Sequence, residues 1–235
     1  MPSNQRAPAF NRLLNALPER ERSSVLDGCE TVELVFADVL YAPGMPFAHA
    51  YFPTASFISL IMPVDAMSSL EVSLVGDEGM FGISLALGVT GSPMRAVVQG
   101  AGTALRMEAA VFAGELARSD ALRQTVNRYI AFQLAQLAQT AACTRFHVVE
   151  ARLARWLLMT QDRAHTNTFH VTQEFLALML GVRRVGVTKA ASSLQRAGLI
   201  RYSRGDMTVL ERRGLKAASC GCYKADQDSY QQILG

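Results

Sequence analysis

Three basic side chains lie close together in the segment VTQEFLALMLGVRRVGVTKAASSLQRAGLI, residues 171–200. Arg183 and Arg184 come two and three residues after a glycine at position 181, and Lys189 follows about one and a half helical turns later. Guanidinium and ammonium groups carry positive charge and donate hydrogen bonds, so they can bind phosphates or the acceptor edges of bases. This spacing therefore favours recognition of a nucleic acid over catalysis.

The residues around this basic group predict two helices joined by a tight turn. Thr172 can cap the first helix by accepting a hydrogen bond from a first-turn amide, and Gly181 permits the left-handed backbone that ends it. The apolar faces follow helical spacing, with Leu176, Met179 and Leu180 in the first helix and Val187, Ala190, Ala191 and Leu194 in the second. This is the form of a helix-turn-helix whose second helix enters the major groove of DNA.

The outer face of this unit carries the side chains that we expect to contact DNA: Thr172, Arg183, Arg184, Val185, Thr188, Lys189 and Ser192. Downstream, LIRYSRGDMTVL (199–210) predicts a β-hairpin turning at a glycine, a wing whose Arg201 and Arg204 could reach phosphates. Residues 147–235 hold 13 Lys and Arg against 7 Asp and Glu, whereas residues 1–146 hold 10 against 13. The basic half should therefore touch the DNA. The alternative is a helical hairpin whose charged face is merely solvated.

Cysteine and histidine residues could supply metal ligands, but their spacing does not predict a site. Cys29 and Cys143 stand far apart in the sequence. Cys220 and Cys222 offer only two sulfurs with no histidine nearby, so we expect these two to be free buried thiols, and we expect no metal or cofactor. Few, scattered cysteines favour a reducing, cytoplasmic setting. The longest apolar runs are too short to span a bilayer. GDEGMFG (76–82) lacks the Gly-Lys-Ser/Thr of a Walker loop, and no nucleophile–base pattern is visible, so an enzyme is not favoured.

The N-terminal half predicts an antiparallel β-roll. Residues 9–27 indicate helices, with Pro18 opening the second, and residues 31–110 contain short strand-like runs separated by Gly and Pro. Residues 119–145 then predict one long helix with an apolar seam: Leu122, Val126, Tyr129, Ile130, Leu134, Leu137 and Ala141. Two interpretations remain, packing of this seam on the chain's own roll or against the same helix of a second copy, and paired half-sites on DNA favour the homodimer.

The order of β-roll, long helix and winged helix-turn-helix resembles the Crp–Fnr family of bacterial transcription regulators, and CGCY at 220–223 resembles a subgroup of it. The resemblance implies an α+β chain: a cyclic-nucleotide-binding-like sensor domain (1–118), a dimerisation helix and hinge (119–146) and a DNA-binding domain (147–235). It also implies a palindromic operator, contact with RNA polymerase, and an effector whose identity is unknown.

Within that resemblance, Arg184 and Lys189 match the family's base-reading positions, but Val185 replaces a glutamate that accepts a hydrogen bond from cytosine. The candidate effector pocket comprises Gly82, Ile83, Ser84, Arg95 and Ala96. Ile83 replaces the ribose-binding glutamate of the cyclic-AMP binders and Ala96 replaces their serine, so we expect no cyclic-AMP binding. An iron–sulfur sensor lacks the clustered N-terminal cysteines. An alternative function is a small-molecule sensor whose main output is not DNA binding.

Overall fold

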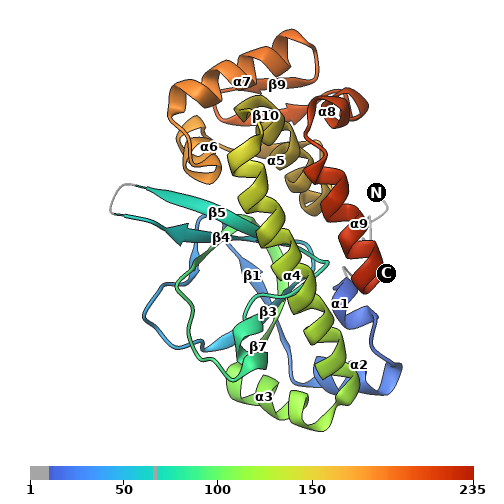
Figure 1. Cartoon of the computed structure of the whole chain (residues 1–235). Helices are drawn as coiled ribbons and strands as arrows, with labels where there is room; N and C mark the ends of the chain where they lie inside the picture. Colours follow the sequence, from blue (N-terminus) through green and yellow to red (C-terminus); the bar gives the residue numbers. More distant parts are fainter. Residues whose placement is uncertain (1–10, 66–67) are drawn as a thin grey trace, which may run out of the picture.

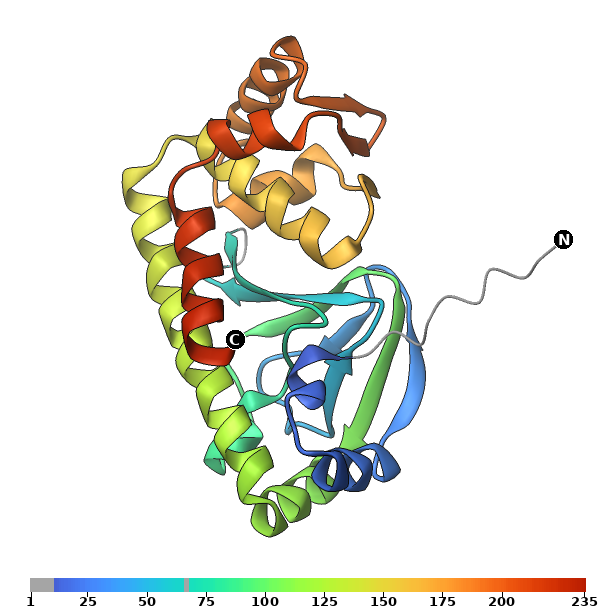
Figure 2. The same cartoon turned by 90° about the vertical axis from the view of Figure 1, so that its right-hand side faces the viewer.

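The computed structural model describes residues 11–65 and 68–235. Figures 1 and 2 show a β-rich lobe and a largely helical C-terminal lobe, connected by the long helix α4 (Asp120–Phe146). We call residues 11–118 the β-lobe and residues 147–235 the C-terminal lobe. In the described part of the chain, no helix is both long enough and apolar enough to cross a membrane.

The β-lobe is built from two antiparallel sheets that enclose an apolar core. One sheet has the order β1 (Glu30–Leu34), β7 (Gly102–Glu108), β3 (His49–Pro53), and the other has the order β2 (Val39–Tyr41), β6 (Arg95–Gly100), β4 (Phe57–Pro63), β5 (Ser69–Val75). The strand-like runs expected within residues 31–110 form these strands. The predicted antiparallel β-roll is confirmed.

Aromatic side chains fill the interior of the β-lobe. Tyr41 stacks on Phe47 with ring centroids 4.3 Å apart, and Phe47 meets Phe81 edge-on at 5.5 Å. The Tyr41 hydroxyl donates to the Met45 carbonyl at 2.8 Å and accepts from the Ser92 amide at 2.8 Å. Because these rings occupy the space between the sheets, the interior is a packed core rather than an open barrel.

Short helices close the ends of the β-lobe. They are α1 (Arg12–Asn15), α2 (Glu19–Asp27), the 3₁₀ helix η1 (Ile83–Leu87) and α3 (Ala109–Arg118). The helices predicted within 9–27 correspond to α1 and α2, and Pro18 stands at the N-cap of α2 as expected; residues 9 and 10 lie outside the described residues. The sequence did not predict α3, whose apolar residues Phe112 and Leu116 pack into the core beneath α4.

Helix α4 confirms the predicted long helix but corrects three of the seven residues in the predicted seam. The Ser119 side chain caps it, accepting from the Leu122 amide at 3.1 Å. Leu122, Val126 and Tyr129 are at most 1 % exposed, buried in the core that α4 shares with the β-lobe. The prediction that these three face a second copy is therefore wrong, because their own roll already covers them. Ile130, Leu134, Leu137 and Ala141 lie further round the helix and are half-buried or exposed.

The C-terminal lobe packs its helices around one apolar core. Its elements are α5 (Val149–Ala164), β8 (Thr168–His170), α6 (Gln173–Leu180), α7 (Arg184–Arg196), β9 (Ile200–Ser203), β10 (Asp206–Val209), α8 (Arg212–Ala218) and α9 (Cys222–Leu234). Strand β8 was not predicted; it adds a third strand to the hairpin, in the order β8-β10-β9.

Helix α9, also unpredicted, is the last helix of the C-terminal lobe and runs back along α4 (Figures 1 and 2). Tyr230 meets Phe132 of α4 edge-on at 5.3 Å, and Arg128 of α4 donates through Nε to the Ile233 carbonyl at 2.6 Å. The last helix of the C-terminal lobe is thus packed against the helix that leads out of the β-lobe.

Buried polar contacts dock the two lobes. Arg163 of α5 pairs with Glu78 of the β-lobe at 2.6 Å, and both side chains are less than a tenth exposed. Trp156 of α5 donates from Nε1 to Glu71 of β5 at 2.7 Å. Since unpaired buried charges are costly, these contacts hold the lobes in a defined relative orientation.

Candidate nucleic-acid interface

The turn between α6 and α7 has the geometry that the sequence predicts. The Thr172 hydroxyl accepts from the Phe175 amide at 3.1 Å and caps α6. Gly181 ends α6 in the left-handed region, with φ 60° and ψ 43°. A side chain is strained in this conformation, so glycine permits the sharp turn into α7.

The two faces of α7 differ as predicted. The inner residues Val187, Ala190, Ala191 and Leu194 are at most 4 % exposed and pack in the C-terminal core. On the outer side, Arg184, Val185, Thr188 and Lys189 are exposed, as is Arg183 just before the helix, and Ser192 is half-buried. The apolar stripe fixes the rotation of α7, and this rotation presents the basic side chains to solvent.

A polar pair at the start of α7 was not anticipated from the sequence. Arg184 Nη1 lies 3.2 Å from Glu174 Oε1, and both side chains are more than 60 % exposed. An exposed pair of this kind contributes about 0–1 kcal/mol, so a stronger acceptor can displace it. Thr188 donates to Gln173 at 2.8 Å, which links the same two helices.

The wing lies directly after α7 and is tied to it. Arg204 and Gly205 both have positive φ, 53° and 90°, as the two central residues of a type I′ hairpin require. The Tyr202 hydroxyl donates to the Val171 carbonyl at 2.8 Å, which fastens β9 to the start of α6. Arg201 and Arg204 are exposed.

Residues 151–218 match the Crp-like helix-turn-helix domain. The chain has the fold of the Crp/Fnr transcription regulators.

Solved structures of similar fold cover both lobes. A putative Crp/Fnr-family transcriptional regulator from Eubacterium rectale superposes with a TM-score of 0.69 at 19% identity, over 88% of this chain and 96% of that one. FixK2 from Bradyrhizobium japonicum gives 0.69 at 12% identity, over 82% and 98%. The Crp/Fnr-family regulator TTHA1359 from Thermus thermophilus gives 0.66 at 23% identity, over 81% and 98%. Comparison with curated protein sequences found no match.

In this Crp/Fnr fold, the residues of the candidate effector pocket lie in different parts of the β-lobe. Gly82 precedes η1 with φ 99°, and Ile83 packs towards the core beneath α4. Ala96 is fully buried in the other core, with the aromatic rings, whereas Arg95 is exposed. The proposed pocket at these residues stays a prediction.

A cleft of about 470 Å³ lies elsewhere, where the two lobes of the Crp/Fnr fold meet α9. Its charged lining includes Arg12, Asp77, Glu78, Asp162, Arg163 and Asp226. No pattern in the sequence indicates this cleft, because its lining comes from segments that are far apart in the chain and meet only when the lobes and α9 pack together.

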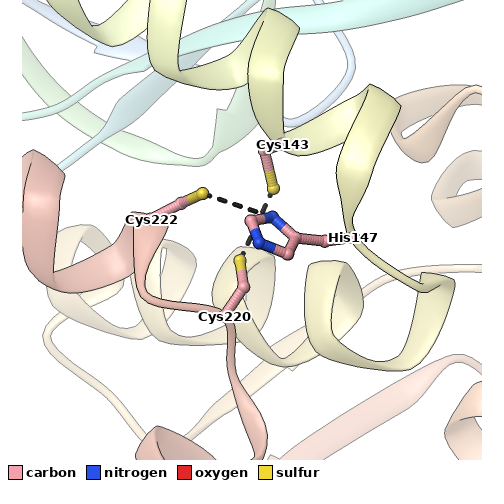
Figure 3. A group of neighbouring side chains, drawn as sticks. All are labelled: Cys143, His147, Cys220 and Cys222. Carbon is pink, nitrogen blue, oxygen red and sulfur yellow. Dashed lines mark hydrogen bonds between the residues drawn. The ribbon is translucent and has the colours of Figure 1, made fainter.

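A second cluster of chemically active side chains was also missed. Cys143, His147, Cys220 and Cys222 converge where α4 meets the start of α9, and their ligand atoms all lie within 4.8 Å of one another (Figure 3). The expectation that Cys220 and Cys222 lack a nearby histidine is wrong: His147 Nδ1 is 3.4 Å from Cys222 Sγ. Cys29 lies outside this cluster, and burial, followed by the charge of Glu115, raises its thiol pKa to about 12.

Proposed function

We propose that this chain is a sequence-specific DNA-binding regulator of transcription that acts as a homodimer. The observation that carries the proposal is the exposed, basic outer face of α7, held by a buried apolar stripe and a glycine turn. In a helix-turn-helix, residues near the start of the second helix contact base edges, and flanking basic residues contact phosphates. We assign the first role to Arg184, Val185, Thr188 and Lys189, and the second to Arg183, Arg201 and Arg204.

Dimerisation is proposed through the part of α4 that the chain's own lobes leave uncovered. Leu134 is 63% exposed, and Ala141 lies on the same side two turns later. Ile130 and Leu137 flank them and are half-buried. A two-fold dimer would present two copies of α7 to a palindromic operator.

The proposed roles differ between the two lobes and the helix that joins them. We propose that residues 1–118 sense an effector, that 119–146 relay its binding, and that 147–235 bind DNA and contact RNA polymerase in the cytoplasm. The cleft between the lobes supports the coupling, since a ligand there would touch α5 and α9 of the C-terminal lobe and the β-lobe together. The same cleft is the specific observation in favour of the second candidate function, a small-molecule sensor whose output is not DNA binding.

The test is selection of DNA from a random pool by the purified full-length protein, followed by titration of the enriched sequence. We expect one palindromic sequence to be enriched, with binding about 10³-fold or more tighter than to scrambled DNA. Lys189→Ala should reduce this preference, whereas Arg20→Ala, at an exposed site on α2, should not. Equal binding to selected and scrambled DNA would reject this function in favour of the sensor without DNA output.

A further inference from the structure

The cluster at the end of α4 draws its four side chains from two distant stretches of chain. Cys143 lies in the last turn of α4, and His147 is the C-cap residue of that helix. Cys220 follows α8, and Cys222 begins α9. Figure 3 shows the three sulfur atoms and the imidazole pointing toward a common centre. Backbone geometry places them there, because the end of α4 and the short link between α8 and α9 meet at this point.

The distances between the ligand atoms fit one tetrahedral ion. Cys143 Sγ and Cys220 Sγ are 3.5 Å apart, and Cys222 Sγ is 3.4 Å from His147 Nδ1. Zinc–sulfur bonds of about 2.3 Å in a tetrahedron place the sulfur atoms roughly 3.7 Å from one another. An iron–sulfur cluster spreads its ligands over several iron atoms, so its ligand atoms would stand farther apart than in this group.

The surroundings differ from those of thiols that merely fill a core. Cys143, Cys220 and Cys222 form a small cluster of their own, apart from the larger apolar cores. Among the described residues, Ala151 is the one partly buried apolar residue packed against it. The Gln139 amide donates from Nε2 to Cys222 Sγ at 2.9 Å, as an outer-shell group does to a metal-bound thiolate.

The charges around the cluster also favour a bound metal ion. Three thiolates and a neutral imidazole around a divalent ion carry a net charge of −1. Arg152 of α5 is buried, and it lines a small cavity together with Cys143. It donates to the Leu180 carbonyl, and among the described residues it forms no ion pair with a carboxylate. A buried cation without a carboxylate partner beside neutral thiols would be costly, whereas a metal–thiolate centre compensates it.

We propose that Cys143, His147, Cys220 and Cys222 bind one Zn²⁺ in a tetrahedral Cys₃His site. Four protein ligands close the coordination sphere, so the ion is structural rather than catalytic. It fastens the start of α9 to the hinge between α4 and α5, where the two lobes are joined. The exposed imidazole of His147 provides the side from which the ion enters. This site stands independently of DNA binding, and its test uses metal content and spectra.

The experiment measures metal in the full-length protein purified under reducing conditions, by elemental mass spectrometry. We expect one zinc per chain in the wild type and in Cys29→Ser, whose thiol lies outside the site. Replacement by Co²⁺ should give the visible bands of a tetrahedral ion and a near-ultraviolet thiolate charge-transfer band. Gln139→Leu should weaken zinc about 10–100-fold, the usual effect of losing an outer-shell partner. Cys222→Ser and His147→Ala should weaken it further.

Thermal unfolding gives a second readout. Zinc at a hundredfold excess over its dissociation constant should raise Tm by roughly 5–10 °C in the wild type and not in Cys222→Ser. If Cys222→Ser does not fold, His147→Ala, altered at an exposed position, and the cobalt spectrum of the wild type still decide. The proposal is overturned if the folded, reduced wild-type protein takes up neither Zn²⁺ nor Co²⁺, or if it contains only Cu⁺ or iron. It is also overturned if His147→Ala binds as much zinc as the wild type.

Discussion

Arg184 and Arg204 are both exposed arginines, but they occupy different places on the C-terminal lobe. Arg184 is the first residue of α7, held 3.2 Å from Glu174 by a weak, exposed pair. Arg204 is at the tip of the wing. The start of a recognition helix points at base edges, whereas the wing flanks the phosphate backbone, so the two side chains should contribute differently.

We predict that Arg184→Ala relaxes the preference at one base pair per half-site and weakens the selected operator, because a bidentate contact to guanine provides about 1–3 kcal/mol of discrimination. Arg204→Ala should instead weaken all sequences alike and lower the salt slope by about one. The measurement is titration against single-base operator changes at two salt concentrations. If Arg184→Ala lowers affinity uniformly, Arg184 is a phosphate contact, and Val185 or Lys189 becomes the candidate reader.

The prediction that cyclic AMP does not bind depends on Ile83 and Ala96. Ile83 has no acceptor for a ribose hydroxyl, and Ala96 is fully buried in the aromatic core of the β-lobe. We therefore expect that millimolar cyclic AMP neither raises Tm nor is needed for DNA binding. A ligand at a hundred times its Kd would add about 2.7 kcal/mol of stability. A thermal shift of several degrees would contradict the prediction.

At the scale of elements, helix α4 packs against its own chain on two of its sides. One side is buried against the β-lobe and another contacts α9, which leaves the side of Leu134 open. We predict that Leu134→Asp shifts a dimer to monomer in analytical ultracentrifugation, since a charge in an apolar seam costs several kcal/mol. Because Leu134 is exposed within one chain, the monomer should keep its fold.

Ala135→Asp is the matched control for this prediction. It introduces the same aspartate at the neighbouring exposed position of α4, but the next residue along a helix points about 100° away. Unchanged dimerisation in Ala135→Asp and its loss in Leu134→Asp would support a seam on one side. A dimer that withstands Leu134→Asp would rule that seam out.

Glu71 is an ionisable residue that links β5 to α5. It accepts hydrogen bonds from Ser59 and from Trp156 of α5, and burial raises its pKa from an ordinary 4.5 to about 7. The folded chain thus holds this proton more tightly than the unfolded chain. Its stabilising contribution is fully present below about pH 4.5 and is lost as the pH rises through 7.

We predict that this group lowers the free energy of unfolding by about 3 kcal/mol between pH 4.5 and pH 8. Glu71→Gln is neutral at every pH and keeps an acceptor for Trp156, so it should remove this part of the pH dependence. Urea unfolding at several pH values, followed by fluorescence of the single tryptophan, measures the difference between the two proteins. Parallel pH profiles would disprove the assignment.

At the scale of the whole molecule, the Glu78–Arg163 pair connects the lobes. Both side chains are buried, and their charged groups approach to 2.6 Å. We predict that Arg163→Met destabilises the chain by about 3–5 kcal/mol, because it leaves the Glu78 carboxylate buried without its partner. Adding Glu78→Gln should recover part of that loss. Chemical denaturation of the four proteins measures the coupling, and additive effects would show that the pair does not join the lobes.

Local pattern determined much of this fold. The strands of the β-lobe, the long helix and the helix-turn-helix follow from short strand-like runs bounded by Gly and Pro, from helical spacing and from a turn glycine, which are properties of neighbouring residues. The outer face of α7 follows in the same way, because the apolar stripe Val187, Ala190, Ala191 and Leu194 fixes the rotation of that helix. These features need no knowledge of distant contacts.

Other features were decided only by tertiary structure. The apolar residues of α4 look alike in sequence, yet Leu122, Val126 and Tyr129 are buried in the chain's own core while Leu134 is exposed, since the β-lobe and α9 cover different sides. Cys143 and Cys220 are 77 positions apart, and their sulfurs meet only because α9 returns along α4. Sequence spacing identifies ligands on one helix or turn, whereas ligands from distant segments become neighbours only when the chain is folded.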